Sequence, residues 1–178
     1  MAKYDLIIIG GGPAGYAATV SALEAGMKVA VIEKERIGGV CVNFGCIPTK
    51  ALLRFAALKK EGQDISYKDA VKQAERIADE RSRSVIKLLE SLGGRIISGK
   101  AVKVETGKVT VDSGEVIEGT NILIATGSAA RKLPIAEYDD THIITSKEAL
   151  EMDSVPGNAV VVGTGATCIE LATVGSRF

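Results

Sequence analysis

The chain has 178 residues, of which 46% are hydrophobic and 20 are glycine, a size that allows one well-buried domain plus some excess. Lys and Arg (22) balance Asp and Glu (22), so no overall charge attracts nucleic acid or an anionic membrane surface. Apolar runs such as Leu6–Ile9 are too short to span a bilayer, and the N-terminus lacks the features of a signal peptide, so we expect a cytoplasmic protein.

The first predicted elements form a β-α-β unit. Residues Tyr4–Ile9 are rich in β-branched side chains and end in glycines, which predicts a buried strand. A helical pattern follows over 14–25 and is closed by Gly26. Residues Lys28–Lys34 form a second apolar run. Two strands joined through a helix are expected to be parallel.

Later segments extend this α/β pattern. Helices are predicted over 48–60 and 67–92. Residues 95–125 alternate short β runs with glycine turns, which indicates a small antiparallel meander. Residues 158–163 repeat the opening theme, a β run followed by a helix from Ala166. We therefore expect an α/β fold of three layers: a parallel sheet, helices on one face and the β-meander on the other.

A glycine-rich loop joins the first strand to the first helix. Gly10 permits a tight turn, Gly12 lets the backbone approach a pyrophosphate, and Gly15 allows close packing of helix on strand. The helix N-terminus offers free N–H groups to phosphates, and Glu33, at the end of the second strand, can accept hydrogen bonds from ribose hydroxyls. The combination predicts a dinucleotide site, but it does not choose between FAD and NAD. The alternative is a glycine turn that merely connects strand and helix.

Two cysteines, Cys41 and Cys46, lie five positions apart. A disulfide needs Cα atoms about 4.4–6.8 Å apart, whereas five residues of regular helix advance about 7.5 Å, so a bridge requires a distorted segment. Gly45 permits the distortion, and Pro48 suits the first turn of the following helix. Cys46 would then lie beside a helix N-terminus, which stabilises a thiolate and lowers its pKa. The arrangement is typical of a dithiol that exchanges with a substrate disulfide.

The cysteine pair has three other interpretations. A static disulfide is rare in a reducing compartment. A zinc site would need further ligands, and only Cys168 and His142 remain to supply them. Two unrelated buried thiols do not account for the flanking glycines and proline.

The segment from Gly38 to Pro48 resembles the active-site signature of class I pyridine-nucleotide disulfide oxidoreductases, which include dihydrolipoamide dehydrogenase, glutathione reductase and mercuric reductase. The resemblance covers the whole chain: it includes both glycine loops and the stretches 125–128 and 145–150. The residues from Cys41 to Leu53 are most similar to dihydrolipoamide dehydrogenases. This resemblance implies a Rossmann-like FAD-binding domain.

The resemblance also implies a role for individual residues. Glu33 would bind the adenosine ribose of FAD, and Cys46 would lie nearest the flavin and form a charge-transfer complex as a thiolate. Cys41 would exchange with the substrate, and Lys50 would lie beside the isoalloxazine, paired with Glu170. The residues thereby assigned to cofactor binding are Gly10, Gly12, Pro13, Ala14, Gly15, Glu33, Lys34, Gly39, Val40, Cys41, Lys50, Ala101, Ala125, Thr126, Gly127, Gly163 and Gly165. No metal site is expected.

The chain departs from the family pattern in two ways. In the second glycine loop, Cys168 stands where a third glycine is usual, so its side chain should push helix from strand or require a compensating gap. Family members are also more than twice this length. We expect residues 1–152 to be an FAD-binding domain that lacks a returning segment, and residues 157–178 to begin an NAD(P)-binding domain. His142 matches no catalytic position of the family.

The leading hypothesis is the FAD-binding, redox-disulfide part of an enzyme that passes electrons between a dithiol and NAD(P). Its substrate would be a small dithiol or disulfide or a lipoyl protein, its parent a homodimer, and this chain alone is expected to lack full turnover. A stand-alone flavin- or nucleotide-binding module is the non-enzymatic alternative. A subunit completed by another polypeptide and a parent similar to mercuric or glutathione reductase remain further alternatives.

Overall fold

The computed structural model describes residues 3–178, and these divide into two compact units. Unit 1 comprises the residues up to Cys41 together with Glu80–Ser128. Unit 2 comprises Val42–Asp79 and Ala129–Phe178. The division differs from the boundary near residue 152 expected from the sequence. That expectation concerns the domains of a longer enzyme, and it stays a prediction.

Unit 1 is built on a six-stranded sheet in the order β3-β2-β1-β6-β5-β4. Its strands are β1 (Lys3–Ile9), β2 (Val29–Glu33), β3 (Arg95–Ser98), β4 (Ala101–Glu105), β5 (Lys108–Val111) and β6 (Val116–Ile124). Strands β3, β2, β1 and β6 are parallel, whereas β6, β5 and β4 are antiparallel neighbours. The predicted parallel β-α-β unit is confirmed, with α1 at Pro13–Glu24 between β1 and β2.

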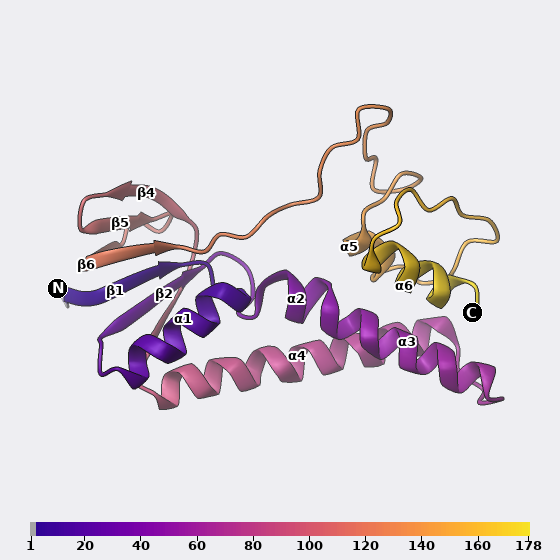
Figure 1. Cartoon of the computed structure of the whole chain (residues 1–178), viewed down its shortest axis with the longest axis horizontal. Helices are drawn as coiled ribbons and strands as arrows, with labels where there is room; N and C mark the ends of the chain where they lie inside the picture. Colours follow the sequence, from indigo (N-terminus) through magenta and orange to yellow (C-terminus); the bar gives the residue numbers. More distant parts are fainter. Residues whose placement is uncertain (1–2) are drawn as a thin grey trace. The chain divides into compact units, whose positions relative to one another are not determined.

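Side chains alternate between the two faces of β1 and build two separate cores. Ile7 and Ile9 pack with Val109, Val111 and Ile117 of the meander. Ile8 faces the other way, into a cluster that includes Ala22 of α1. Figure 1 shows α1 on one side of the parallel strands and β4 and β5 on the other side. The expected three-layer arrangement is therefore confirmed.

The predicted meander over 95–125 is wrong in one respect. Residues Arg95–Ser98 pair in parallel with β2, so they belong to the parallel sheet. Strand β6 pairs antiparallel with β5 and also in parallel with β1, which joins the meander to the main sheet. Short apolar runs look the same in both settings, because pairing direction depends on the partner strand rather than on local sequence.

Three helices lie between β2 and β3 in the chain: α2 (Gly39–Phe44), α3 (Cys46–Lys60) and α4 (Tyr67–Ser91). The sequence predicted α3 and α4 but not α2. Gly45, with φ −151° and ψ −108°, separates α2 from α3. Within the described residues, the stretch Gly39–Lys60 has the length and composition of a membrane-crossing helix, at a mean hydropathy of 1.2. Leu52 and Ala56 of this stretch are completely buried, and 28% of the apolar window is buried inside the protein.

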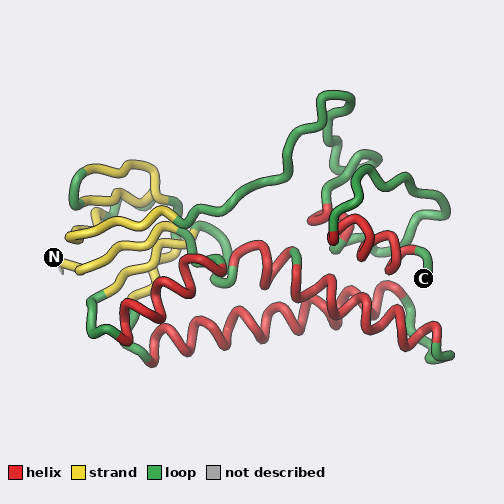
Figure 2. The backbone as a smooth tube through the Cα atoms, in the orientation of Figure 1, coloured by secondary structure: helices red, strands yellow, loops and turns green. Residues whose placement is uncertain are grey.

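Unit 2 has a small helical core. Leu52 of α3 and Ala70 and Ala74 of α4 pack with Leu150 and Val174. Two short helices complete the unit, α5 (Ser146–Ala149) and α6 (Ala166–Gly175), and Figure 2 shows the loops, in green, that connect them. The hydroxyl of Tyr67 donates a hydrogen bond to the carbonyl of Ala149 (3.0 Å), and burial raises the pKa of this tyrosine.

The predicted strand over 158–163 is not formed. These residues have no regular structure, and Val160 is 91% exposed. A strand needs a neighbour for its backbone hydrogen bonds. In the described part of unit 2 the only bridge pairs Leu133 with Ala136, so no such neighbour lies beside residues 158–163.

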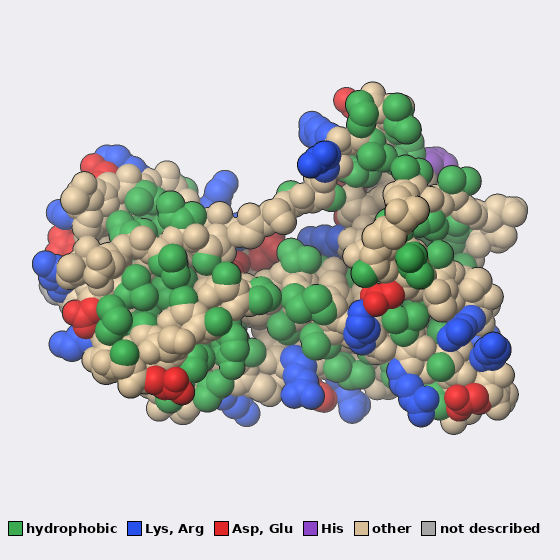
Figure 3. Space-filling view, viewed as in Figure 1, with side chains coloured by type: hydrophobic (Ala, Val, Ile, Leu, Met, Phe, Trp, Pro, Cys, Tyr) green, Lys and Arg blue, Asp and Glu red, His purple; other side chains and the backbone are tan. Residues whose placement is uncertain are grey.

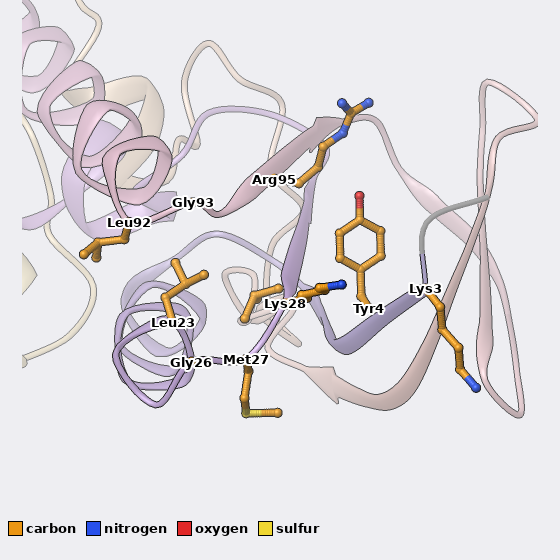
Figure 4. A pocket seen from close by; sticks show the side chains of 10 residues that line it. Lys3, Tyr4, Leu23, Gly26, Met27, Lys28, Leu92, Gly93 and Arg95 are labelled. Carbon is orange, nitrogen blue, oxygen red and sulfur yellow. The ribbon is translucent and has the colours of Figure 1, made fainter.

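An open pocket of about 420 Å³ lies at the amino-terminal ends of β1 to β3. Its lining includes Tyr4, Lys3, Lys28 and Arg95 (Figure 4). In this view Lys3 and Arg95 extend in opposite directions, so their charges do not converge on a common point. The pocket lies at the opposite end of the strands from the glycine loop.

Candidate functional site

The loop Gly10–Gly12 joins β1 to α1 with little room for side chains. Gly10 has φ +105°, and a Cβ there would lie 2.2 Å from the carbonyl oxygen of Ala125. A Cβ on Gly15 would lie 1.8 Å from the carbonyl oxygen of Gly10. The close approach of α1 to β1 expected from the sequence therefore depends on Gly15, whereas Gly10 allows the loop to approach the residue that follows β6.

Gly12 has a different environment. A Cβ at this position would meet only the Cα of Gly39, at the ordinary contact distance of 3.8 Å. Gly12 is the N-cap of α1, and no side chain among the described residues caps this end of the helix. Pro13 and Ala14 of its first turn are exposed. Space beside Gly12 and a free helix N-terminus are what a dinucleotide diphosphate requires.

Glu33 supports the glycine loop from the end of β2. Its carboxylate accepts hydrogen bonds from the backbone N–H of Gly11 (2.7 Å) and of Glu35 (2.9 Å). Its carbonyl accepts the N–H of Gly99 (2.9 Å), which places the turn before Ala101 at the same edge of the sheet. Lys34, next in the chain, is exposed. The assignment of Glu33 to a ribose stays a prediction. The structure adds a second role, which is to fix the shape of the loop.

The start of α2 lies against the same loop. Gly39 has φ +58°, and a Cβ there would lie 2.7 Å from the Cα of Gly12. The N–H of Gly38 donates to the carbonyl of Gly11 (2.8 Å). Val40 follows and is 60% exposed. The segment from Gly38 to Pro48, which contains both cysteines, thus begins in direct contact with the glycine loop.

The end of β6 completes this edge of the sheet. The N–H of Ala125 donates to the carbonyl of Ile9 (2.8 Å), and Thr126 and Gly127 follow as exposed residues. Ile124 is 67% exposed, and Figure 3 shows hydrophobic side chains, in green, on the surface of this part of the molecule. The carboxyl ends of β1, β2 and β6 meet here, where open α/β sheets bind their ligands.

Cys41 and Cys46 are joined in a disulfide, and Cys168 is the free cysteine. Cys41 is half-buried in α2, whereas Cys46 is the exposed first residue of α3. The helical break at Gly45 replaces the regular advance that would keep the two Cα atoms apart. No acidic residue stands in the first turn of α3 and no side chain caps its described N-terminus, so its N–H groups can stabilise a thiolate at Cys46 after reduction.

Two further residues named from the sequence meet within unit 2. The ammonium of Lys50, on α3, forms an ion pair and hydrogen bond with the carboxylate of Glu170, on α6. The lysine side chain is 60% exposed and the glutamate side chain 24%. The pairing is a feature of the structure. The assignment of the pair to catalysis stays a prediction.

The second glycine loop shows how Cys168 is accommodated. A Cβ on Gly163 would lie 2.9 Å from the sulfur of Cys168, and Gly163 has φ +129°. The sulfur also lies 3.8 Å from the carbonyl oxygen of Val162. The Cys168 sulfur thus lies against Gly163, but residues 158–163 form no strand, so the expected effect of the cysteine on helix–strand packing stays a prediction. Gly165 is the N-cap of α6, and the assignment of Gly163 and Gly165 to cofactor binding stays a prediction.

Comparison with known proteins agrees with this geometry. Residues 4–178 match the family described as pyridine nucleotide-disulphide oxidoreductase. The chain belongs to this family. Among curated relatives, dihydrolipoyl dehydrogenase of Chlorobaculum tepidum is 41% identical over 189 residues, which covers 96% of this chain and 40% of the relative. Dihydrolipoyl dehydrogenase of Bacillus subtilis is 33% identical, over 97% of this chain and 41% of the relative.

Two solved structures share the fold. The flavoprotein disulfide reductase RclA of Escherichia coli has a TM-score of 0.86 and 26% identity, and the match covers 98% of this chain and 40% of that chain. LpdA of Mycobacterium tuberculosis has a TM-score of 0.73 and 29% identity, over 85% of this chain and 38% of that chain. The present chain spans about 40% of the length of the curated relatives described above.

Several residues at the site were given no individual role from the sequence. Gly11, Ile37 and Gly38 shape the loop through backbone contacts: a Cβ on Gly11 would lie 2.5 Å from the side chain of Ile37. The run of three glycines at 10–12 was a signal for Gly11, since a motif with two required glycines does not explain the middle one. Phe44 and Lys147 also meet in unit 2, and no local pattern could have paired them.

Proposed function

We propose that this chain forms the FAD-binding, redox-disulfide part of a flavoprotein disulfide oxidoreductase, with a parent reaction in which a dithiol such as dihydrolipoamide reduces NAD(P). The proposal is supported by one observation above all. The helix that carries Cys41 begins at Gly39, and Gly39 lies on Gly12 of the glycine loop. Cys41 therefore stands two residues after the glycine that touches the backbone proposed to bind a dinucleotide diphosphate.

The residues of unit 1 fit FAD. The diphosphate would lie beside Gly12 at the uncapped N-terminus of α1. The ribose would lie near Glu33, and the turn Ala125–Gly127 would contact the cofactor from the end of β6. When bound, FAD accepts two electrons from the dithiol and passes them to NAD(P).

The chain's own cysteines would perform the exchange with substrate. A substrate thiolate attacks the sulfur of Cys41, so that a mixed disulfide forms and Cys46 leaves as a thiolate. The second substrate thiol, deprotonated, then attacks the mixed disulfide, and Cys41 is released and takes up a proton. One substrate dithiol becomes a disulfide, and two electrons reach the cysteine pair. The ion pair with Glu170 would orient Lys50 for its role beside the flavin.

Several broader features belong to the same proposal. The substrate is a small dithiol or disulfide or a lipoyl protein, the whole enzyme is a homodimer, and it works in the cytoplasm. The relatives named as dihydrolipoyl dehydrogenases favour the dithiol substrate over those of glutathione and mercuric reductases.

The substitution Gly12→Ala separates cofactor binding from folding. Gly12 has φ −72° and ψ −173°, which alanine adopts, and its Cβ would make no close contact with protein. We expect the variant to keep the thermal unfolding midpoint of the wild type and to bind FAD about tenfold more weakly or worse, because the methyl group occupies the space of the diphosphate. Flavin fluorescence quenching measures the affinity.

The disulfide supplies the second arm of the test. Cys41→Ser is expected to bind FAD with the wild-type affinity but to lose reversible oxidation of the pair in dithiothreitol buffers. If the wild-type chain binds FAD yet its cysteines do not cycle, the alternative of a flavin-binding module without catalysis replaces the enzyme. If Gly12→Ala binds FAD as well as the wild type, the assignment of the glycine loop fails.

A further inference from the structure

A cation from α5 contacts the segment between the two redox cysteines. The ammonium nitrogen of Lys147 lies 4.5 Å from the centre of the Phe44 ring. Phe44 ends α2 and stands two residues before Cys46. Lys147, Phe44 and Cys46 all belong to unit 2. An ammonium over an aromatic face at this distance is attracted by the negative face of the ring.

The position of Lys147 is fixed by contacts that do not involve its ammonium. Thr145 and Glu148 form a capping box at the start of α5, and the hydroxyl of Thr145 holds the pKa of Glu148 below its ordinary value. Leu150, just after the helix, is buried in the core of unit 2. Tyr67 donates its hydroxyl to the carbonyl of Ala149 (3.0 Å). A helix of one turn is thereby held in place at both ends.

We propose that Lys147 is a positioning residue for the redox disulfide: through the ring of Phe44 it holds the segment between the cysteines and keeps a positive charge beside it. The inference rests on the proposed function of the cysteine pair. The positive charge of Lys147 matters because reduction creates a negatively charged thiolate at Cys46, beside the uncapped N-terminus of α3. A nearby cation favours the thiolate and therefore the reduced form.

The reduction can be measured without a flavin. Dithiothreitol breaks the Cys41–Cys46 bond through a mixed disulfide, and the reagent becomes its cyclic disulfide. Two electrons pass to the protein, together with two protons when both thiols are neutral and one when Cys46 is a thiolate. Loss of the Lys147 charge destabilises that thiolate, so the equilibrium shifts toward the disulfide.

The experiment equilibrates the 178-residue chain with reduced and oxidised dithiothreitol at neutral pH. Free thiols are then alkylated, and the tryptic segment 37–50, which contains both cysteines, is quantified by mass spectrometry, separately from the segment that contains Cys168. For Lys147→Gln we expect the equilibrium constant for reduction to fall about threefold, or about 14 mV in reduction potential. Lys147→Met, which keeps the aliphatic stem, should give the same fall and is a second variant in case the first does not fold.

Rescue and control variants separate this role from a general structural one. Lys147→Arg keeps both the charge and the ring contact, so it should retain the wild-type constant. Phe44→Leu removes the ring contact but keeps the Lys147 charge, so the constant should fall less than in Lys147→Gln, and the double variant should fall no further than Lys147→Gln alone. Lys72→Gln removes an exposed lysine from α4 in the same unit and should leave the constant unchanged.

The possible results divide clearly. Provided that the wild-type pair still cycles, three results would overturn the inference. The constant could be unchanged in Lys147→Gln and Lys147→Met, it could fall in Lys147→Arg, or it could fall equally in Lys72→Gln. If the wild-type pair forms no reversible dithiol, the proposed function fails first and this inference with it.

Discussion

The backbones of Gly39 and Gly12 are in direct contact, although the two residues belong to different motifs. A Cβ at residue 39 would lie 2.7 Å from the Cα of Gly12, a distance that real Cβ atoms essentially never show. This contact joins the dinucleotide loop to the helix that carries Cys41. It is therefore the point at which a substitution should disturb both features together.

Gly39→Ala should destabilise unit 1 more than an ordinary glycine substitution. Gly39 and Gly26 both have positive φ, +58° and +79°, so alanine at either position costs about 1–2 kcal/mol of backbone strain. A Cβ at Gly26 meets no atom within 4 Å, whereas one at Gly39 meets the backbone of Gly12. We expect Gly39→Ala to lower the free energy of unfolding by at least about 1 kcal/mol more than Gly26→Ala.

Urea denaturation measures the free energy of unfolding of Gly39→Ala and Gly26→Ala, and hydrogen exchange of the β1 amides reports the stability of the sheet in each variant. Gly39→Ala should also weaken FAD binding, because displacement of α2 moves the glycine loop. Equal losses of stability in the two variants would show that the Gly39–Gly12 contact relaxes without cost.

Glu33→Gln should loosen the glycine loop. The carboxylate uses one oxygen for the N–H of Gly11 and the other for the N–H of Glu35. A glutamine side chain offers one oxygen and turns an NH₂ group toward the other donor, so one hydrogen bond is lost at a cost of about 1–2 kcal/mol. FAD affinity should fall as well, since Gly11 adjoins the diphosphate position.

The matched control for Glu33 is Glu35→Gln. The carboxylate of Glu35 pairs with Lys34 at 3.7 Å on the exposed surface, an interaction worth little in water. Stability and FAD affinity should both stay at the wild-type level in this variant. A Glu33→Gln protein with wild-type affinity would contradict the role of the carboxylate in shaping the loop.

The sequence was sufficient for the first β-α-β unit because several local signals agree there. The run of β-branched residues in β1, the glycines that end it and the acid at the end of β2 are all close in the sequence and indicate the same unit. Helix α2 was missed because its six residues include two valines and a glycine, which have low helix propensity. Its position depends on the contact of Gly39 with Gly12, which local propensity does not encode.

Long-range partners account for the other differences. The segment 158–163 has strand-forming residues, but β structure requires a neighbouring strand that unit 2, as described, does not provide. The pairing of Lys50 with Glu170 was expected only through resemblance to a family, since nothing near either residue indicates the other. The contact of Lys147 with Phe44 was indicated neither by local sequence nor by the resemblance to a family.

The Lys50–Glu170 ion pair should contribute little to stability. The lysine side chain is 60% exposed, so solvent screens the attraction, and a double-mutant cycle with Lys50→Met and Glu170→Gln should give a coupling free energy below about 1 kcal/mol. The pair Lys68–Asp153 (2.9 Å, 55% and 82% exposed) is the control and should couple still more weakly. A coupling of several kcal/mol would mean that the pair holds α6 on α3 rather than orienting Lys50.

The turn that follows Asp139 should open in acid. The Asp139 carboxylate accepts the backbone N–H groups of Ile143 (2.8 Å), Thr141 (2.9 Å) and His142 (2.7 Å), which hold its pKa well below the ordinary range. A carboxylate whose pKa is lowered by folding stabilises the turn above the pKa of the unfolded chain, about 3.9. That contribution is lost as the pH falls through the lower pKa of the folded turn.

The amides of residues 141–143 report on this turn through hydrogen exchange. Their protection should be constant from pH 5 to neutral, and Asp139→Asn should reduce it at every pH in that range, because an amide oxygen is a weaker acceptor than a carboxylate. Asp140→Asn is the control: Asp140 has φ +58°, which asparagine tolerates, and its side chain is not among the acceptors of these amides. Equal protection in Asp139→Asn and the wild type would show that the backbone alone maintains the turn.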